Sequence, residues 1–302
     1  MVRRLALLLV LALPLSAATF KAADGTVLHY EVIGDVTGRG APVVMLAGGP
    51  GFSPGYLEPV ARTLRKEVRS VLFHQRGTGL STMETITAET HKLQTLVADL
   101  ESLRTELKAE KLTLLGHSFG GILAMMYAAE HPDRVAALVL VDSGGPTLAS
   151  MPKFVANFNA RLTAEDNAKV KEWSDPAKMA ENRKRAILEI TRARTPAYFA
   201  DRAKAKRLMD ALTEESFNDA VLWAVTPQMM AGLDLREALK GVKAPVLVLH
   251  GKQDPLETAE EVHAAFDGAK LVVIDGAGHF PWEEQPEKFF APLTEFLRIL
   301  RR

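Results

Sequence analysis

Short apolar runs recur along the chain and predict the strands of a buried sheet. They are rich in valine and leucine and are bounded by glycine, proline or aspartate. Such runs suit strands covered on both faces, as in a mainly parallel sheet. The runs are PVVMLA (42–47), SVLFH (70–74), LTLLG (112–116), AALVLVD (136–142), PVLVLHG (245–251) and KLVVID (270–275). VLHYEVIG (27–34), which precedes them, alternates in polarity and predicts an edge strand.

Stretches with helical spacing separate these runs in the first half of the chain. They include YLEPVARTLRKE (56–67), THKLQTLVADLESLRTELKAE (90–110) and the residues that follow Ser118. The second stretch places six apolar residues on one face: Leu93, Leu96, Val97, Leu100, Leu103 and Leu107. Strands and helices that alternate in this way predict a doubly wound α/β sheet.

The alternation stops near Gly145, and strands resume only at Pro245. Residues 146–235 contain helical patterns without a strand run, and we call this segment the cap. Its patterns are FVANFNARL (154–162), DPAKMAENRKRAILEITRAR (175–194), AYFADRAKAKRLMDALT (197–213) and SFNDAVLWAVTPQMM (216–230). A helical insertion between two strands is expected over the carboxyl edge of the sheet, where such sheets bind ligands. The core then comprises residues 19–145 and 236–302.

The composition excludes several classes of function. The chain has 302 residues, 47% of them hydrophobic, and its 37 basic residues balance 37 acidic ones. A net charge of zero gives no electrostatic reason to expect nucleic acid as a partner. With no cysteine there is no disulfide, thiolate metal site or cysteine nucleophile. No metal-binding or nucleotide-binding motif stands out, so we expect no cofactor.

The amino terminus has the three-part layout of a secretory signal peptide. MVRR is basic, LALLLVLALPL is apolar, and Ser16-Ala17-Ala18 offers small residues for cleavage after Ala18. Residues 1–18 are therefore predicted to be removed, which would leave a periplasmic or secreted protein. The apolar run is short for a stable membrane anchor, so no membrane insertion is expected after cleavage. An uncleaved anchor is the alternative interpretation.

The segment LLGHSFGG (114–121) joins a predicted strand to a predicted helix and contains the pattern G-x-S-x-G around Ser118. A sharp strand-to-helix turn holds such a serine in a strained backbone conformation, and flanking glycines relieve the crowding. The serine would then stand at the amino end of a helix, where developing negative charge is stabilised. This context predicts that Ser118 is a nucleophile rather than part of a structural turn.

A serine hydroxyl needs a base, and two residues beyond late strands supply a base and its partner. His279 lies in a glycine-containing loop after the last strand run, and Asp254 follows PVLVLH. The order Ser118, Asp254, His279 is the order expected for a catalytic triad on this architecture. Asp142 also ends a strand and is the alternative acid. His117 is expected to point away from the site and to serve packing.

An oxyanion hole requires two backbone N–H groups near the nucleophile. The N–H of Phe119, directly after the serine, is one candidate. The loop AGGPGF (47–52) follows an early strand, and the N–H of Gly49 is the other candidate. Glycine in that loop lets the backbone approach a substrate carbonyl closely.

With these features the chain resembles an α/β-hydrolase over nearly all of its length after the signal peptide. Within that superfamily, GGPG (48–51) and QRGTGLS (75–81) are similar to the prolyl iminopeptidase group of serine aminopeptidases. GHFPWEEQPE (278–287) resembles the general superfamily ending. The chain departs from the group at Ala47 and His74, where the group has histidine and aspartate, and in GHSFGG, where it usually has G-G-S-W-G.

The resemblance implies an aminopeptidase that removes amino-terminal residues, often proline, from short peptides. Such an enzyme must bind an α-ammonium group, and the resemblance implies carboxylates in the cap for this role. The candidates are Glu181, Glu189, Asp210, Glu214, Glu215 and Asp219.

An esterase or other small-molecule acyl hydrolase would need the same triad without the ammonium site. The cap residues Phe154, Phe158, Trp223, Met229 and Met230 could line its pocket, although we favour them as the core of the cap itself. A non-catalytic binding protein on the same scaffold is a third possibility, disfavoured because all three triad candidates are present. Serine at position 118 argues against epoxide hydrolase and dehalogenase chemistry, which normally uses aspartate there.

Overall fold

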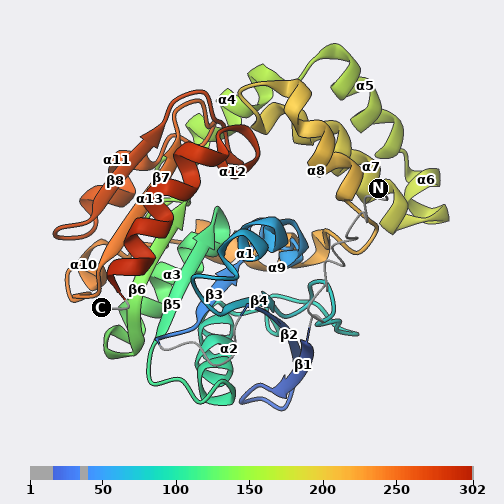
Figure 1. The fold of residues 1–302 in the computed structure, drawn as a ribbon. Coiled ribbons are helices and arrows are strands. Elements are labelled where there is room, and N and C mark those ends of the chain that lie inside the picture. The colour runs from blue at the N-terminus through green and yellow to red at the C-terminus, as the bar shows by residue number, and fades with distance from the viewer. Residues whose placement is uncertain (1–15, 35–39, 301–302) are drawn as a thin grey trace, which may run out of the picture.

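The computed structural model describes residues 16–34 and 40–300, and their strands form one twisted sheet (Figure 1). The strand order is β1-β2-β4-β3-β5-β6-β7-β8. β1 pairs antiparallel with β2, and β2 with β4, while the remaining neighbours are parallel. The bounds are β1 Ser16–Lys21, β2 Val27–Ile33, β3 Val43–Leu46, β4 Ser70–His74, β5 Leu112–His117, β6 Val135–Val141, β7 Val246–Gly251 and β8 Lys270–Ile274. The predicted mainly parallel sheet is confirmed.

All the predicted strand runs form strands, but two expectations about the sheet edges are wrong. β2 is not an edge strand, because β1 pairs along its outer side over six residue pairs. β8 was expected to be covered on both faces, yet only Ile274 of its five residues is buried and Val273 is 47% exposed. β8 is the last strand of the sheet, and the helices beside it leave part of its surface open.

The predicted signal peptide lies mostly outside the described residues. Its last three residues, 16–18, form the first half of β1 and pair with residues 30–32 of β2. Cleavage after Ala18 would therefore shorten β1 to its second half. In the part of the chain that the structure describes, no helix combines the length and the apolar character needed to cross a bilayer.

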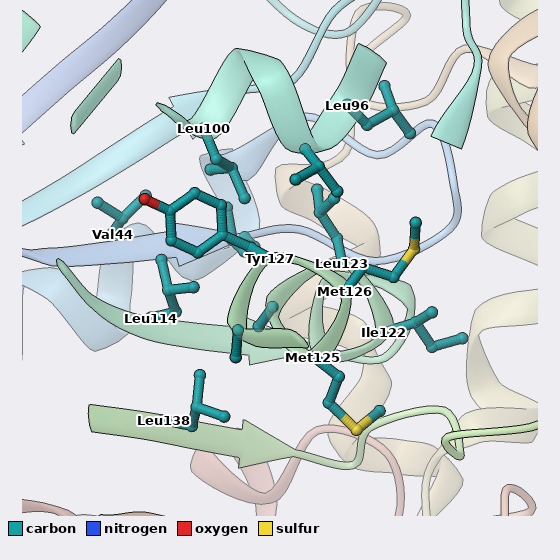
Figure 2. Close-up of a cluster of buried hydrophobic side chains, with 14 of the residues drawn as sticks. Val44, Leu96, Leu100, Leu114, Ile122, Leu123, Met125, Met126, Tyr127 and Leu138 are labelled. Atoms are coloured by element: carbon teal, nitrogen blue, oxygen red, sulfur yellow. The ribbon is translucent and has the colours of Figure 1, made fainter. Parts of the chain in front are cut away.

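Two hydrophobic layers cover the two faces of the sheet. On one face, side chains of α2 (Leu93–Glu106) and α3 (Phe119–Glu130) pack on Val44, Leu114 and Leu138 (Figure 2). On the other, α1 (Glu58–Leu64) and α13 (Pro286–Ile299) pack on the alternate residues of the same strands. The predicted apolar face of α2 is present, with five of its six residues buried and Leu107 partly buried. Shorter helices complete the core: α10 Arg236–Leu239, α11 Ala259–Ala264 and α12 Pro281–Glu284.

The segment between β6 and β7 consists of helices joined by loops and contains no named strand (Figure 1). The α-helices that precede α10 in this segment are α4 Met151–Arg161, α5 Ala164–Trp173, α6 Pro176–Glu181, α7 Arg183–Arg194, α8 Lys206–Ala211 and α9 Asp219–Met230. The two segments that connect the cap to the core lie side by side, because Thr147 and Asp234 form an isolated antiparallel β-bridge. The single helical pattern expected over residues 175–194 is two helices, because the Asn182 side chain caps α7 and interrupts the run.

Candidate active site

Ser118 lies on the sharp turn between β5 and α3 that its glycine-rich context predicts. Its backbone has φ 56° and ψ −121°, a conformation that residues with side chains rarely adopt. A Cβ atom added at Gly120 would lie 2.1 Å from the carbonyl oxygen of Leu46 in β3. Only glycine at this position lets α3 begin so close to the sheet.

A cavity of about 660 Å³ opens at this turn, between the core and the cap. Ser118 and His279 both line it, together with Gly48 and Gly49 of the early glycine loop. Apolar side chains of the cap contribute about half of the other lining residues, among them Ile187, Ile190, Leu208, Leu212, Leu222 and Trp223. The structure therefore brings the predicted nucleophile and base to one largely apolar cavity that is partly open to solvent.

His279 is held by Asp254, as the order of the residues predicts. Its Nδ1 lies 2.7 Å from Asp254 Oδ2, and both side chains are buried. A ring nitrogen that bonds to a carboxylate carries the proton, which leaves Nε2 with a free lone pair. Burial lowers the pKa of His279 to about 3, so the ring is neutral and able to accept a proton at ordinary pH. The Tyr198 ring stacks on it with centroids 5.0 Å apart.

Asp142, the alternative acid, is buried beside Asp254 rather than bonded to His279. Its Oδ1 accepts a hydrogen bond from the Gly251 N–H at 2.7 Å, and its Oδ2 has no partner other than the carboxyl group of Asp254. Burial and the neighbouring carboxylate raise the pKa of Asp142 well above its ordinary range. Burial also raises the pKa of Asp254, to about 8, and the pair shares a proton that we assign to Asp142, because the hydrogen bond between the carboxyl groups raises the pKa of Asp142 and lowers that of Asp254. His250 lies 3.8 Å from each carboxyl group, and burial lowers its pKa to about 4.

The same cluster of polar atoms is compact enough to be compared with a set of metal ligands. The ligand atoms of Asp142, Asp254 and His279 lie within 4.8 Å of one another, a spacing that a metal ion could bridge. The His279 and Asp254 atoms are already bonded to each other, and Asp142 to the backbone. Two of the three side chains are thus bonded to each other, whereas Asp142 Oδ2 has no hydrogen-bond partner among the described residues other than the Asp254 carboxyl group.

The two N–H groups predicted for an oxyanion hole are free. Gly49 lies in the loop against the serine, where a Cβ atom added at Gly48 would be 2.8 Å from Ser118 Cβ. The Gly48 N–H donates to the Tyr56 hydroxyl at 2.7 Å and is occupied. Neither the Gly49 nor the Phe119 N–H donates a hydrogen bond to any residue within the described ranges.

Comparison with known proteins places this geometry in a family. The sequence matches the alpha/beta hydrolase family over residues 43–292. The chain belongs to that family. Proline iminopeptidases from Lactobacillus delbrueckii subsp. lactis and Xylella fastidiosa (strain Temecula1) are each 28% identical to it, over 89% and 87% of this chain and 94% and 90% of theirs.

Solved structures share the fold of this hydrolase. A proline iminopeptidase-related protein from Thermus thermophilus superposes with a TM-score of 0.73 at 23% identity, covering 95% of this chain and 99% of that one. An esterase from Exiguobacterium antarcticum gives a TM-score of 0.66 at 24% identity, over 93% and 98%. The resemblance to α/β-hydrolases and to prolyl iminopeptidases is confirmed at the level of family.

The expectation that His117 points away from the site and only packs is wrong, because in this hydrolase it lines the cavity and forms two hydrogen bonds. Its Nε2 lies 2.8 Å from the carbonyl oxygen of His279, and its Nδ1 lies 2.8 Å from the Tyr56 hydroxyl. A carbonyl only accepts, so Nε2 carries the proton, Nδ1 accepts from Tyr56, and Tyr56 accepts from Gly48. One chain of hydrogen bonds thus joins the glycine loop, the serine turn and the histidine loop. No local pattern marks Tyr56 for this role.

Glu284 ties the cap of the hydrolase to the histidine loop and was also missed from the sequence. Its buried carboxylate accepts N–H bonds from Gly278 at 2.6 Å, Asp201 at 2.9 Å and Ala200 at 3.2 Å. The His279 N–H donates to the Tyr198 carbonyl at 2.8 Å. The position of the candidate base therefore depends on contacts with the cap.

The motif QRGTGLS supports the site from a distance. Gln75 donates to the Ala47 carbonyl at 2.9 Å, just before the glycine loop. Arg76 is buried and forms two hydrogen bonds to Asp99, at 2.6 and 2.7 Å. Neither side chain lines the cavity. Of the two motifs that suggested the prolyl iminopeptidase resemblance, GGPG lines the cavity through its two leading glycines, whereas Gln75 and Arg76 of QRGTGLS have a structural role.

Few of the cap residues considered for substrate binding line the cavity. Of the six candidate carboxylates, only Asp219 lines the cavity, and it is paired with Arg183. Of the five apolar candidates, only Trp223 lines it; Phe158 and Met229 are buried in the protein and Met230 is exposed. The expectation that these apolar residues mainly form the core of the cap fails for Trp223 and Met230, and also for Met229, which is buried in the hydrophobic cluster of α2, α3 and the sheet.

Proposed function

We propose that the protein is a serine hydrolase that cleaves carboxylic esters through an acyl-enzyme intermediate. The observation that carries this proposal is Ser118, strained on its turn, facing the cavity that the Asp254-bonded His279 also lines. A nucleophile, a neutral base and an orienting carboxylate are the parts that acyl transfer requires.

In this mechanism Nε2 of His279 takes the proton of Ser118 as its oxygen attacks the substrate carbonyl. The N–H groups of Gly49 and Phe119 stabilise the oxyanion, and losing one such donor typically costs about 3–4 kcal/mol in the barrier. The imidazolium then protonates the leaving alcohol. Water, deprotonated by His279, attacks the acyl-enzyme and releases the acid. Asp254 holds the Nδ1–H tautomer and stabilises the imidazolium in both steps.

The cavity wall favours an ester over a peptide with a free amino terminus. An α-ammonium group needs an unpaired carboxylate, and the wall offers only Asp219, which Arg183 already neutralises. Removal of amino-terminal residues from short peptides is the second candidate. It is favoured by the names of the proline iminopeptidase relatives and by the matching sequence motifs.

A substrate panel on the purified protein separates the two candidates. It compares p-nitrophenyl acetate with proline- and alanine-β-naphthylamide and with N-blocked forms of both amides. We expect ester cleavage and no preference for the free amines. Faster cleavage of free than of blocked amides would establish the aminopeptidase instead. Cleavage of none of them would support a non-catalytic binding protein.

A further inference from the structure

Three formally charged side chains of the cap line the cavity: two are positive and one is negative. Arg183 and Asp219 form an ion pair across the wall. Arg194 forms no ion pair with an acidic residue within the described ranges. Its guanidinium group instead lies over the Phe158 ring in a cation–π contact. The wall therefore carries one positive charge in excess beside an otherwise largely apolar surface.

Packing fixes where this charge lies relative to the reacting groups. The guanidinium carbon of Arg194 is 5.0 Å from the centre of the Phe158 ring. That ring packs on Tyr198 at 4.5 Å, and Tyr198 stacks on His279 at 5.0 Å. Stacking on an aromatic ring holds a guanidinium in place while its N–H groups stay free to bind. Three successive contacts thus connect the cation to the candidate base.

We infer that the substrate of this site carries a carboxylate, bound by Arg194, at the end remote from the ester. This inference rests on the proposed ester hydrolysis. A guanidinium binds a carboxylate through two parallel hydrogen bonds, which are stronger than bonds between neutral groups. Arg194 and Ser118 line the same cavity, whose wall is otherwise largely apolar and fits a hydrocarbon linker, so the substrate class is the half-ester of a dicarboxylic acid. A substrate ammonium group would meet repulsion in the same place.

The test measures kcat/KM for p-nitrophenyl half-esters of succinic, glutaric, adipic and suberic acid. Each is compared with its own distal methyl ester, which has nearly the same shape and no charge. We expect the acid to be favoured over its methyl ester by roughly 10-fold for at least one chain length, the scale of a charged hydrogen bond. Added salt should weaken this preference, because the wall is partly open to solvent.

Variants of Arg194 test whether this residue causes the preference for the acid over its methyl ester. Arg194→Gln should abolish the acid-to-methyl-ester preference, and Arg194→Lys should restore part of it. Arg185→Gln is the matched control, because Arg185 is on the same helix, pairs with Glu189 and does not line the cavity. Thermal unfolding of each variant reports whether the fold is retained.

Each outcome decides a separate point. A wild-type preference for the methyl esters would overturn the inference and leave ester hydrolysis intact. A preference that survives Arg194→Gln, or that Arg185→Gln removes equally, would also overturn it. Hydrolysis of none of these esters would contradict the proposed function, and the inference with it.

Discussion

Replacing Asp254 and Asp142 by asparagine, one at a time, tests how the buried carboxyl pair supports His279. At Asp254, Oδ1 accepts from the Leu256 N–H at 2.9 Å and Oδ2 accepts from His279. Asparagine has only one acceptor oxygen. If the Leu256 N–H keeps that oxygen, the amide NH₂ faces Nδ1 and drives the proton to Nε2. The ring can then no longer act as a base.

At Asp142 the same change preserves the hydrogen bonds. The amide oxygen can accept from the Gly251 N–H, and the NH₂ group can donate to Asp254 as the protonated carboxyl does. We therefore expect Asp254→Asn to lower kcat by roughly 10³–10⁴-fold, as wrong-tautomer variants do. This corresponds to about 4–5.5 kcal/mol in the barrier. Asp142→Asn should lower kcat by less than about 10-fold, because one neutral donor replaces another.

The assay is steady-state hydrolysis of p-nitrophenyl acetate, with thermal unfolding of each variant as the control for folding. Asp142→Ala provides a further comparison, because it leaves the buried Gly251 N–H unpaired and should lower stability by about 1–3 kcal/mol. If Asp142→Asn were as damaging as Asp254→Asn in a folded protein, Asp142 would be the acid of the triad and our assignment would be wrong.

Three further results are expected. Tyr56→Phe leaves two buried hydrogen-bonding groups unpaired, so urea unfolding should show a loss of about 2–3 kcal/mol and kcat should fall; unchanged values would refute the proposed link. Gly120→Ala puts a Cβ atom 2.1 Å from a backbone oxygen and should cost about 3 kcal/mol or more in thermal unfolding, whereas Gly55→Ala, with 3.8 Å of clearance, should not. Stability should fall below about pH 6.5, because His250 and His279 stay neutral in the fold, with pKa values lowered to about 4 and 3, but take up protons when unfolded. The slope, from urea titrations at several pH values, should approach about 1.4 kcal/mol per pH unit for each ring, offset in part by the protonated carboxyl pair; a flat profile would contradict it.

Local patterns in the sequence were sufficient to predict seven of the eight strands of the sheet. Each parallel strand is a continuous apolar run, and the serine turn is encoded by glycines within a few residues of Ser118. β1 was missed because its small and apolar residues fit a cleavage site as well as a strand. Export of the chain stays a prediction.

Contacts between distant segments could not be predicted. Tyr56 and His117 are 61 residues apart, and Glu284 binds cap backbone more than 80 residues away. The sequence offered six cap carboxylates without showing that Arg183 neutralises the one in the wall. The chemistry of the substrate pocket therefore depends on which side chains of the cap face the cavity. Local sequence patterns do not predict which side chains these are.

The most direct test of the central claim is reaction with a fluorophosphonate, followed by intact-mass measurement and peptide mapping. We predict a single adduct, located on Ser118. The Ser118→Ala variant should bind no reagent and hydrolyse no substrate while unfolding at nearly the same temperature. An adduct on another residue, or turnover at the parental rate in Ser118→Ala, would contradict the account.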